Sequence, residues 1–133
     1  MRPTIPILAL CLASGQAQAQ PRQVDHVQTA SDLAAVCDPA TSGVVRLEAI
    51  AYCQGFLTSA GQYHALIYPQ GGPLRPLFCV PNPGPSVAES GIGFARWVRE
   101  NPGYANEPAL DSLLRWAQAR FPCPATPPRR RAR

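Results

Sequence analysis

The sequence feature that most constrains the fold is a long helical pattern over residues 44–67. At about 100° per residue, its apolar and aromatic side chains lie within about 60° of one line, which is typical of a helix with one buried face. These side chains are Val45, Ala49, Tyr52, Cys53, Phe56, Ala60, Tyr63 and Ile67. A narrower line carries Gly55 and Ser59, two small residues that would let another helix backbone approach closely. The pattern therefore predicts a core helix, with the function carried elsewhere.

Capping residues and proline breaks place three further helices around it. The candidate caps are Thr29 with Asp32, Thr41 or Ser42 for the long helix, Ser86 with Glu89, and Asn106 with Pro108 in the first turn. The last helix has a predicted buried line of Leu110, Leu113, Leu114, Ala117 and Phe121. Since no segment alternates with period two, the sequence predicts an all-α fold, a small bundle of about four antiparallel helices.

The N-terminus has the composition of a secretory signal peptide. Arg2 precedes a short apolar run over residues 5–13, and Ala17 and Ala19 fit a small-x-small cleavage site, so residues 1–19 are expected to be removed. The run is too short to span a bilayer, and no second run is long enough. We therefore expect a periplasmic protein with no membrane anchor.

Four cysteines remain after that cleavage: Cys37, Cys53, Cys79 and Cys123. An even number in an oxidising compartment predicts two disulfides, whereas a zinc site would need closely spaced pairs. Four cysteines allow three pairings, and the spacing does not choose among them. Each bridge should contribute about 3 to 4 kcal/mol, mainly by restricting the unfolded chain. No metal or other cofactor is expected.

The positive charge belongs to the end of the chain. Four of the twelve arginines lie in residues 129–133, and without these four and Arg2 the chain has seven arginines against eight acidic residues. We therefore expect no nucleic-acid partner. The absence of lysine excludes a P-loop lysine and Schiff-base chemistry. The expected organisation is a flexible lead-in over residues 20–28, a helical domain over 29–124, and a disordered tail over 125–133 rich in arginine and proline.

Three short segments resemble a known family: residues 52–57 (YCQGFL), 78–81 (FCVP) and 121–123 (FPC). Together with Cys37 and the break at residues 101–102, they are similar to the type VI secretion amidase immunity proteins over nearly the whole mature domain. The resemblance implies a small, helical, disulfide-bonded periplasmic protein, often dimeric, that binds and blocks a cell-wall amidase. Ser59 departs from the glycine expected there, and neither the gap between Tyr68 and Phe78 nor the arginine tail is a family signature.

The sequence offers no catalytic constellation. His26 lies in the lead-in, and His64 lies three helical turns from Cys53, too far for a Cys/His pair. We therefore expect a binding protein rather than an enzyme. Immunity to a wall amidase is its most specific form, and the alternative is a general periplasmic structural, stress or binding protein of the same fold with no effector partner. A neighbouring gene for an exported amidase would favour the first.

The predicted partner-binding surface is the loop after the long helix. Its contact residues would be Tyr68, Gln70, Leu74 and Arg75, in a loop stiffened by three prolines and anchored by Cys79. Tyrosine and arginine are frequent at energetic hot spots of interfaces. The turn over residues 103–107 is the second choice.

Overall fold

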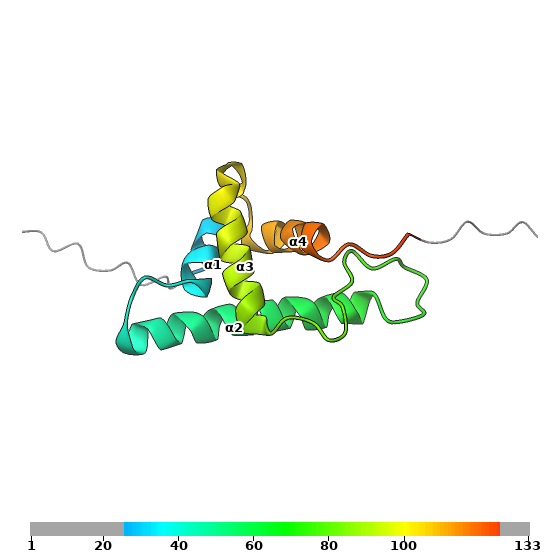
Figure 1. The fold of residues 1–133 in the computed structure, drawn as a ribbon, viewed down its shortest axis with the longest axis horizontal. Coiled ribbons are helices and arrows are strands. Elements are labelled where there is room, and N and C mark those ends of the chain that lie inside the picture. The colour runs from blue at the N-terminus through cyan, green and yellow to red at the C-terminus, as the bar shows by residue number, and fades with distance from the viewer. Residues whose placement is uncertain (1–25, 126–133) are drawn as a thin grey trace, which may run out of the picture.

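The computed structural model describes residues 26–125 (Figure 1). The predicted signal peptide, most of the lead-in and the tail from residue 126 lie outside the described residues. The elements are α1 (Ala30–Cys37), α2 (Gly43–Ile67), α3 (Val87–Glu100), the short 3₁₀ helix η1 (Pro102–Tyr104) and α4 (Ala109–Arg120). The predicted all-α fold with two disulfides is confirmed, and residues 26–125 contain no β-strand.

Two helices begin at capping residues that the sequence predicts, and each forms a reciprocal capping box. At the start of α1, the Thr29 hydroxyl accepts the N–H of Asp32, whose carboxylate accepts the N–H of Thr29 (3.0 Å). At the start of α3, Ser86 and Glu89 form the same reciprocal pair. The hydrogen bonds from Ser86 lower the pKa of Glu89. Such pairs satisfy amide groups that a helix N-terminus otherwise leaves unpaired.

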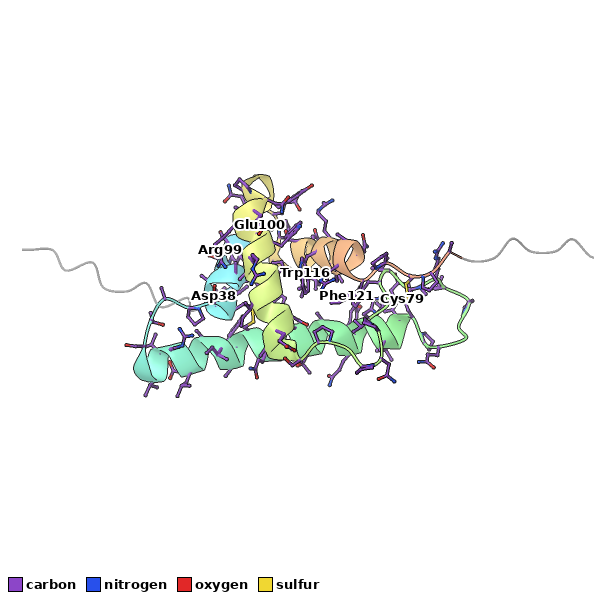
Figure 2. The ribbon with its side chains drawn as sticks, in the orientation of Figure 1. Asp38, Cys79, Arg99, Glu100, Trp116 and Phe121 are labelled. Carbon is purple, nitrogen blue, oxygen red and sulfur yellow. A yellow bond between two sulfur atoms is a disulfide. The ribbon has the colours of Figure 1, made fainter. Side chains whose placement is uncertain are left out.

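The core lies where α1 meets α3 and α4. Phe94 and Leu33 are fully buried, and the Phe94 ring contacts the edge of Trp116, with 6.0 Å between the ring centroids. Because α1 has only eight residues, it is too short to be stable alone and depends on this packing. An ion pair between Arg99 and Asp38 (3.0 Å) joins the ends of α3 and α1 at the surface (Figure 2).

The expectation that α2 is a core helix is wrong. Of its 25 residues, only Cys53 is buried, while Tyr63 on the predicted buried line is 62% exposed. The described part of the chain places its other helices on one side of α2 (Figure 1). At about 1.5 Å per residue, α2 is about 37 Å long, whereas α1, α3 and α4 are about 12, 21 and 18 Å. The partners of α2 are therefore too short to cover it.

The predicted arrangement of the helices also needs correction. The helices are not all antiparallel, because α3 crosses α2 (Figure 1). Ser42 occupies the N-cap position of α2, but its side chain makes no capping hydrogen bond. The start predicted for the last helix at Asn106 is too early, since α4 begins at Ala109. On α4, Leu110 is 41% exposed rather than buried.

Tertiary backbone pairing explains the late start of α4. Ala30 donates its N–H to the Glu107 carbonyl (2.9 Å), and Ala109 donates its N–H to the Gln28 carbonyl (2.8 Å). These bonds flank an isolated antiparallel bridge between Thr29 and Pro108. The chain just before α4 is thus held extended against the start of α1, and it cannot form a helical turn there.

Candidate functional site

The first candidate surface is an apolar groove on the exposed face of α2. It has a volume of about 660 Å³ and is open to solvent. Its lining residues are Tyr52, Gly55, Phe56, Ser59, Ala60 and Tyr63 of α2, together with Leu110 of α4. Tyr52 and Tyr63 are exposed, and Phe56 is half-buried between them. None of the lining residues is charged, so the groove is suited to an apolar partner surface.

The small residues in this groove do not receive a helix of the same chain. A Cβ atom built on Gly55 would meet nothing within 4 Å, and Ser59 is exposed. The expectation of a close helix backbone at this position is therefore wrong within the described chain. The residues remain available to a helix of another chain.

The second candidate surface is the connecting segment, residues 68–86 between α2 and α3. The structure places all four predicted contact residues in its first part. Leu74 is 56% exposed, and Gln70 and Arg75 are exposed as well. Tyr68 is half-buried and its ring lies against His64, with 4.9 Å between the ring centroids. The predicted set is thus one apolar and two polar exposed side chains beside a half-buried tyrosine.

The connecting segment is anchored at several points. The Leu77 N–H donates to Nε2 of His64 (3.2 Å), and the Phe78 ring stacks on that imidazole with 4.0 Å between the centroids. The Cys79 N–H donates to the Phe121 carbonyl (2.8 Å), and Arg75 donates to the Pro124 carbonyl (3.2 Å). The exposed residues in the first part are therefore followed directly by anchored residues, 77–79, in the middle of the segment.

His64 has a positioning role that sequence reasoning missed. Its neutral imidazole must offer a lone pair at Nε2 to accept the Leu77 N–H. Burial lowers the pKa of His64, which favours this neutral form. The signal in the sequence is weak: a histidine one turn before the helix end, followed by Tyr68 and Phe78, two aromatic residues that can flank it.

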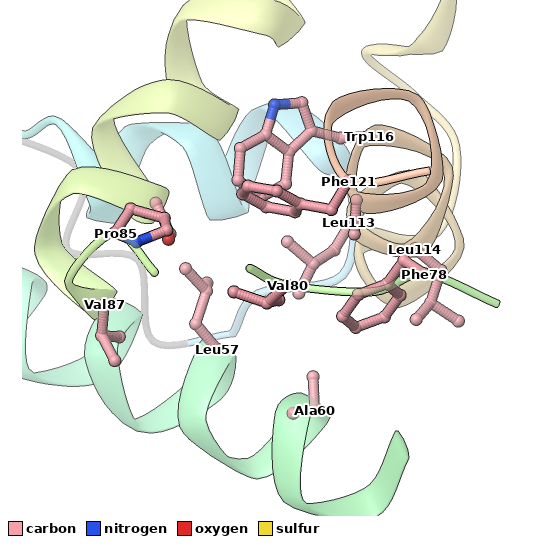
Figure 3. A pocket seen from close by; sticks show the side chains of 13 residues that line it. Leu57, Ala60, Phe78, Val80, Pro85, Val87, Leu113, Leu114, Trp116 and Phe121 are labelled. Atoms are coloured by element: carbon pink, nitrogen blue, oxygen red, sulfur yellow. The ribbon is translucent and has the colours of Figure 1, made fainter. Parts of the chain in front are cut away.

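An apolar cavity of about 190 Å³ lies beneath the connecting segment, between α2 and α4 (Figure 3). Leu57 and Ala60 of α2 line one side, and Trp116 of α4 lines another. Phe78 and Val80, on either side of Cys79, complete the wall together with Phe121. The connecting segment thus contributes to the packing between two helices, although most of its side chains are exposed.

The described residues have their cysteines paired in disulfides. Residues 26–125 contain no cluster of histidine, cysteine, aspartate or glutamate that could hold a metal ion. The four cysteines form Cys37–Cys53 and Cys79–Cys123, which confirms two disulfides and selects one of the three pairings. A disulfide sulfur is no nucleophile, so the cysteines within this range offer no covalent catalysis.

No helix of the described chain is long and apolar enough to cross a membrane.

Comparison with known proteins places the chain in a family. No curated protein matches it, and no solved structure does. Residues 29–123, however, match the sequence model of the family described as Rap1a immunity proteins. That range runs from the capping residue of α1 to the last disulfide cysteine, Cys123, and includes all four helices. The chain therefore belongs to the Rap1a immunity protein family, a family of type VI effector immunity proteins.

Proposed function

We propose that this immunity protein acts in the periplasm, where it binds a secreted peptidoglycan amidase and blocks the active site of that enzyme sterically. Membership of the family supports an effector as the partner. Steric inhibition needs no reactive group on the inhibitor. The amidase is the effector class that the sequence resemblance implies.

The observation that carries this proposal is the exposed and anchored first part of the connecting segment. Leu74 and Arg75 are exposed and immediately precede the residues held by His64 and by the Cys79–Cys123 disulfide. Fixing a binding loop beforehand lowers the entropy that it loses on association. A loop of this kind can enter a cleft and exclude the wall peptide.

The test is a double substitution, Leu74→Ala with Arg75→Ala. We expect affinity for the amidase to fall by about 2 kcal/mol, which is about thirtyfold in Kd, because both side chains would be buried at the interface. Titration calorimetry measures the affinity, and inhibition of peptidoglycan cleavage should weaken in parallel. The melting temperature should change little, since both residues are exposed and the hydrogen bond from Arg75 to the Pro124 carbonyl lies at the surface.

The matched control is Ile92→Ala with Arg96→Ala. This pair also removes one exposed aliphatic side chain and one exposed arginine, but from α3. Its affinity should equal that of the unchanged protein. If the loop variant binds as tightly as this control, the recognition surface lies elsewhere. The turn over residues 103–107 would then be the next region to test, because Tyr104 and Arg115 stack there (4.9 Å).

We further propose that the groove on α2 is a homodimer interface. Around its centre, the pattern of side chains reads nearly the same in both directions. Tyr52 lies three residues before Gly55, and Tyr63 lies four residues after Ser59. A second copy of α2 in antiparallel orientation would therefore place each tyrosine of one copy against the other tyrosine of its partner. Such self-complementarity is what a two-fold interface requires.

The dimer proposal can be tested with two neighbouring hydroxyl residues. Ser59→Leu places a bulky side chain in the groove, whereas Thr58→Leu places it on a different, exposed part of α2. Sedimentation equilibrium should show dimers for the unchanged protein and for Thr58→Leu, and monomers for Ser59→Leu. A monomeric unchanged protein at micromolar concentration, or a dimer that tolerates Ser59→Leu, would contradict the interface.

A further inference from the structure

The two disulfides lie in different environments. Cys37 and Cys53 are 7% and 3% exposed, and they join α1 to α2. Gly91 of α3 covers this bridge so closely that an added Cβ atom would lie 2.8 Å from Sγ of Cys53. Cys79 and Cys123 are half-buried. The second bridge is therefore more accessible to thiol reagents than the first, whose two cysteines are buried and line a small pocket of about 100 Å³.

The second disulfide does not join two helices. It connects the connecting segment to the C-terminal segment, residues 121–125 after α4. The hydrogen bonds beside it join the same two segments, from Cys79 to Phe121 and from Arg75 to Pro124. If the bridge opened, these two hydrogen bonds would still join the segments, but without a covalent bond between them. The contacts of α1 with α2, α3 and α4 do not involve either segment.

Residues next to the bridge in sequence line the apolar cavity. Phe78 and Val80 flank Cys79, and Phe121 precedes Cys123 by two residues (Figure 3). Phe121 is buried and contacts the edge of Trp116, with 5.7 Å between the ring centroids. When the bridge is intact, the connecting segment is covalently tied next to this wall. When it is open, noncovalent contacts remain: the stacking of His64 on Phe78, the packing of Phe78 against the core and the hydrogen bonds.

We propose that Cys79–Cys123 is a thiol-responsive clamp that controls the amidase-binding loop, an inference that depends on the function proposed above. The reductant is a dithiol. One thiolate of the dithiol attacks a sulfur of the bridge, forms a mixed disulfide and releases the other cysteine as a thiolate, which takes up a proton. The second thiol of the dithiol then loses its proton and attacks the mixed disulfide, and the remaining protein cysteine leaves as a thiolate, which takes up a proton. Two electrons pass to the bridge, which ends as two thiols, and the dithiol ends as a disulfide.

Opening the clamp has two consequences. The connecting segment gains conformational freedom, so it must lose more entropy when it binds the amidase, and affinity falls. The core keeps its own disulfide and its helices. Effector binding is thereby coupled to the oxidation state of the compartment, and the protein reaches full affinity only where the clamp is oxidised.

The first experiment needs no effector. The protein isolated in its oxidised form is treated with dithiothreitol at neutral pH, alkylated at intervals and analysed by mass spectrometry. Cys79 and Cys123 should be labelled at least about tenfold faster than Cys37 and Cys53, because thiol exchange depends on access. Circular dichroism should keep its helical signal at that stage, and hydrogen exchange should rise in residues 68–86 and 121–125. Equal labelling rates, or loss of helix together with the first reduction, would overturn the clamp.

The second experiment measures affinity for the amidase with the clamp open. Cys79→Ser with Cys123→Ser should bind at least about tenfold more weakly than the oxidised protein while it remains helical. An unchanged affinity overturns the control of binding. The proposed function is judged separately, because its test uses the oxidised protein with Leu74 and Arg75 replaced. If the oxidised protein binds no amidase, the proposed function fails, whereas the order of labelling still decides whether the disulfide opens as a clamp.

Discussion

The region around Cys37–Cys53 and the region around Cys79–Cys123 are both stapled by a disulfide, but they are stabilised differently. In the first, the sulfur atoms are part of the core and are covered by Gly91. In the second, the bridge joins two segments without helical structure over a partly open cavity. The same covalent bond therefore completes close packing in one region and substitutes for it in the other. Rigidity of the exposed segment comes from a cross-link and a few polar contacts.

Two physical effects, loop entropy and packing, favour different bridges. Loop entropy alone favours the Cys79–Cys123 bridge, because its ends are 44 residues apart rather than 16, which is worth about 1 kcal/mol more. Packing favours the Cys37–Cys53 bridge, because both of its cysteines are buried, whereas Cys79 and Cys123 are half-buried. If packing outweighs loop length, removing the Cys37–Cys53 bridge costs more unfolding free energy than removing the Cys79–Cys123 bridge.

The largest loss of unfolding free energy is therefore expected when the buried bridge is removed. Cys37→Ala with Cys53→Ala should lower the free energy of unfolding by about 5 kcal/mol, from loop entropy of about 3 kcal/mol and about 1 kcal/mol for each buried sulfur. Cys79→Ala with Cys123→Ala should cost about 4 kcal/mol, nearly all of it entropic. Urea unfolding at one pH measures both. A larger loss for the second pair would show that loop length decides and that the two regions do not differ in this way.

A smaller effect compares one glycine from each environment. Gly91→Ala places a Cβ atom 2.8 Å from Sγ of the buried Cys53, and it should destabilise the protein by about 1 to 3 kcal/mol. Gly61→Ala is the matched change in α2, beside the cavity, where a Cβ atom meets nothing within 4 Å. It should stabilise the protein by about 0.5 to 1 kcal/mol, because alanine favours the helix. Thermal unfolding of both variants checks the opposite signs, and effects of the same sign would contradict the difference in packing.

Local signals predicted the parts of the fold that depend on few neighbours. The capping boxes at Thr29 and Ser86 involve residues three apart, and both are present in the structure. The start of α4 was not predictable, because Glu107 and Ala109 are held by backbone bonds to residues 28 and 30. Those partners lie nearly eighty residues away, and no local pattern identifies them.

The exposure of α2 shows a second limit of sequence reasoning. Periodicity identifies an apolar face, but it does not say whether the rest of the chain is large enough to cover that face. Tyr52 and Tyr63 lie on the predicted line and are nevertheless exposed. The lengths of the predicted helices held the missing information, since all three of the other helices are much shorter than α2.

The candidate site was predicted in part. The four loop residues lie together, but their use in binding stays a prediction. The sequence identified the cysteines as disulfide partners without giving the pairing, because pairing depends on how the helices meet. The anchoring of the loop by His64 and the C-terminal segment was missed for the same reason: both contacts join parts of the chain that no spacing rule relates.

The smallest expected effect is a pH dependence that belongs to the second region alone. Burial lowers the pKa of His64 in the folded protein below its usual value of about 6.5. The unfolded chain therefore binds the proton first as the pH falls. The stability that the neutral imidazole contributes is complete above about pH 6.5 and is lost as the pH falls through the folded-state pKa. Because His64 is only partly buried, we expect a loss of less than about 1 kcal/mol.

Protonation at Nε2 would replace the acceptor of the Leu77 N–H by a donor, so this hydrogen bond would break first. Amide exchange followed by NMR between pH 8 and pH 5, corrected for intrinsic rates, should show lower protection of Leu77 while Phe94 in the core stays protected. In His64→Gln, the pH-dependent part should disappear, because glutamine does not titrate. If Phe94 loses protection together with Leu77, the two regions open as one unit. In that case the contacts of His64 and the Cys79–Cys123 disulfide would contribute to the stability of the core as well as to that of the connecting segment.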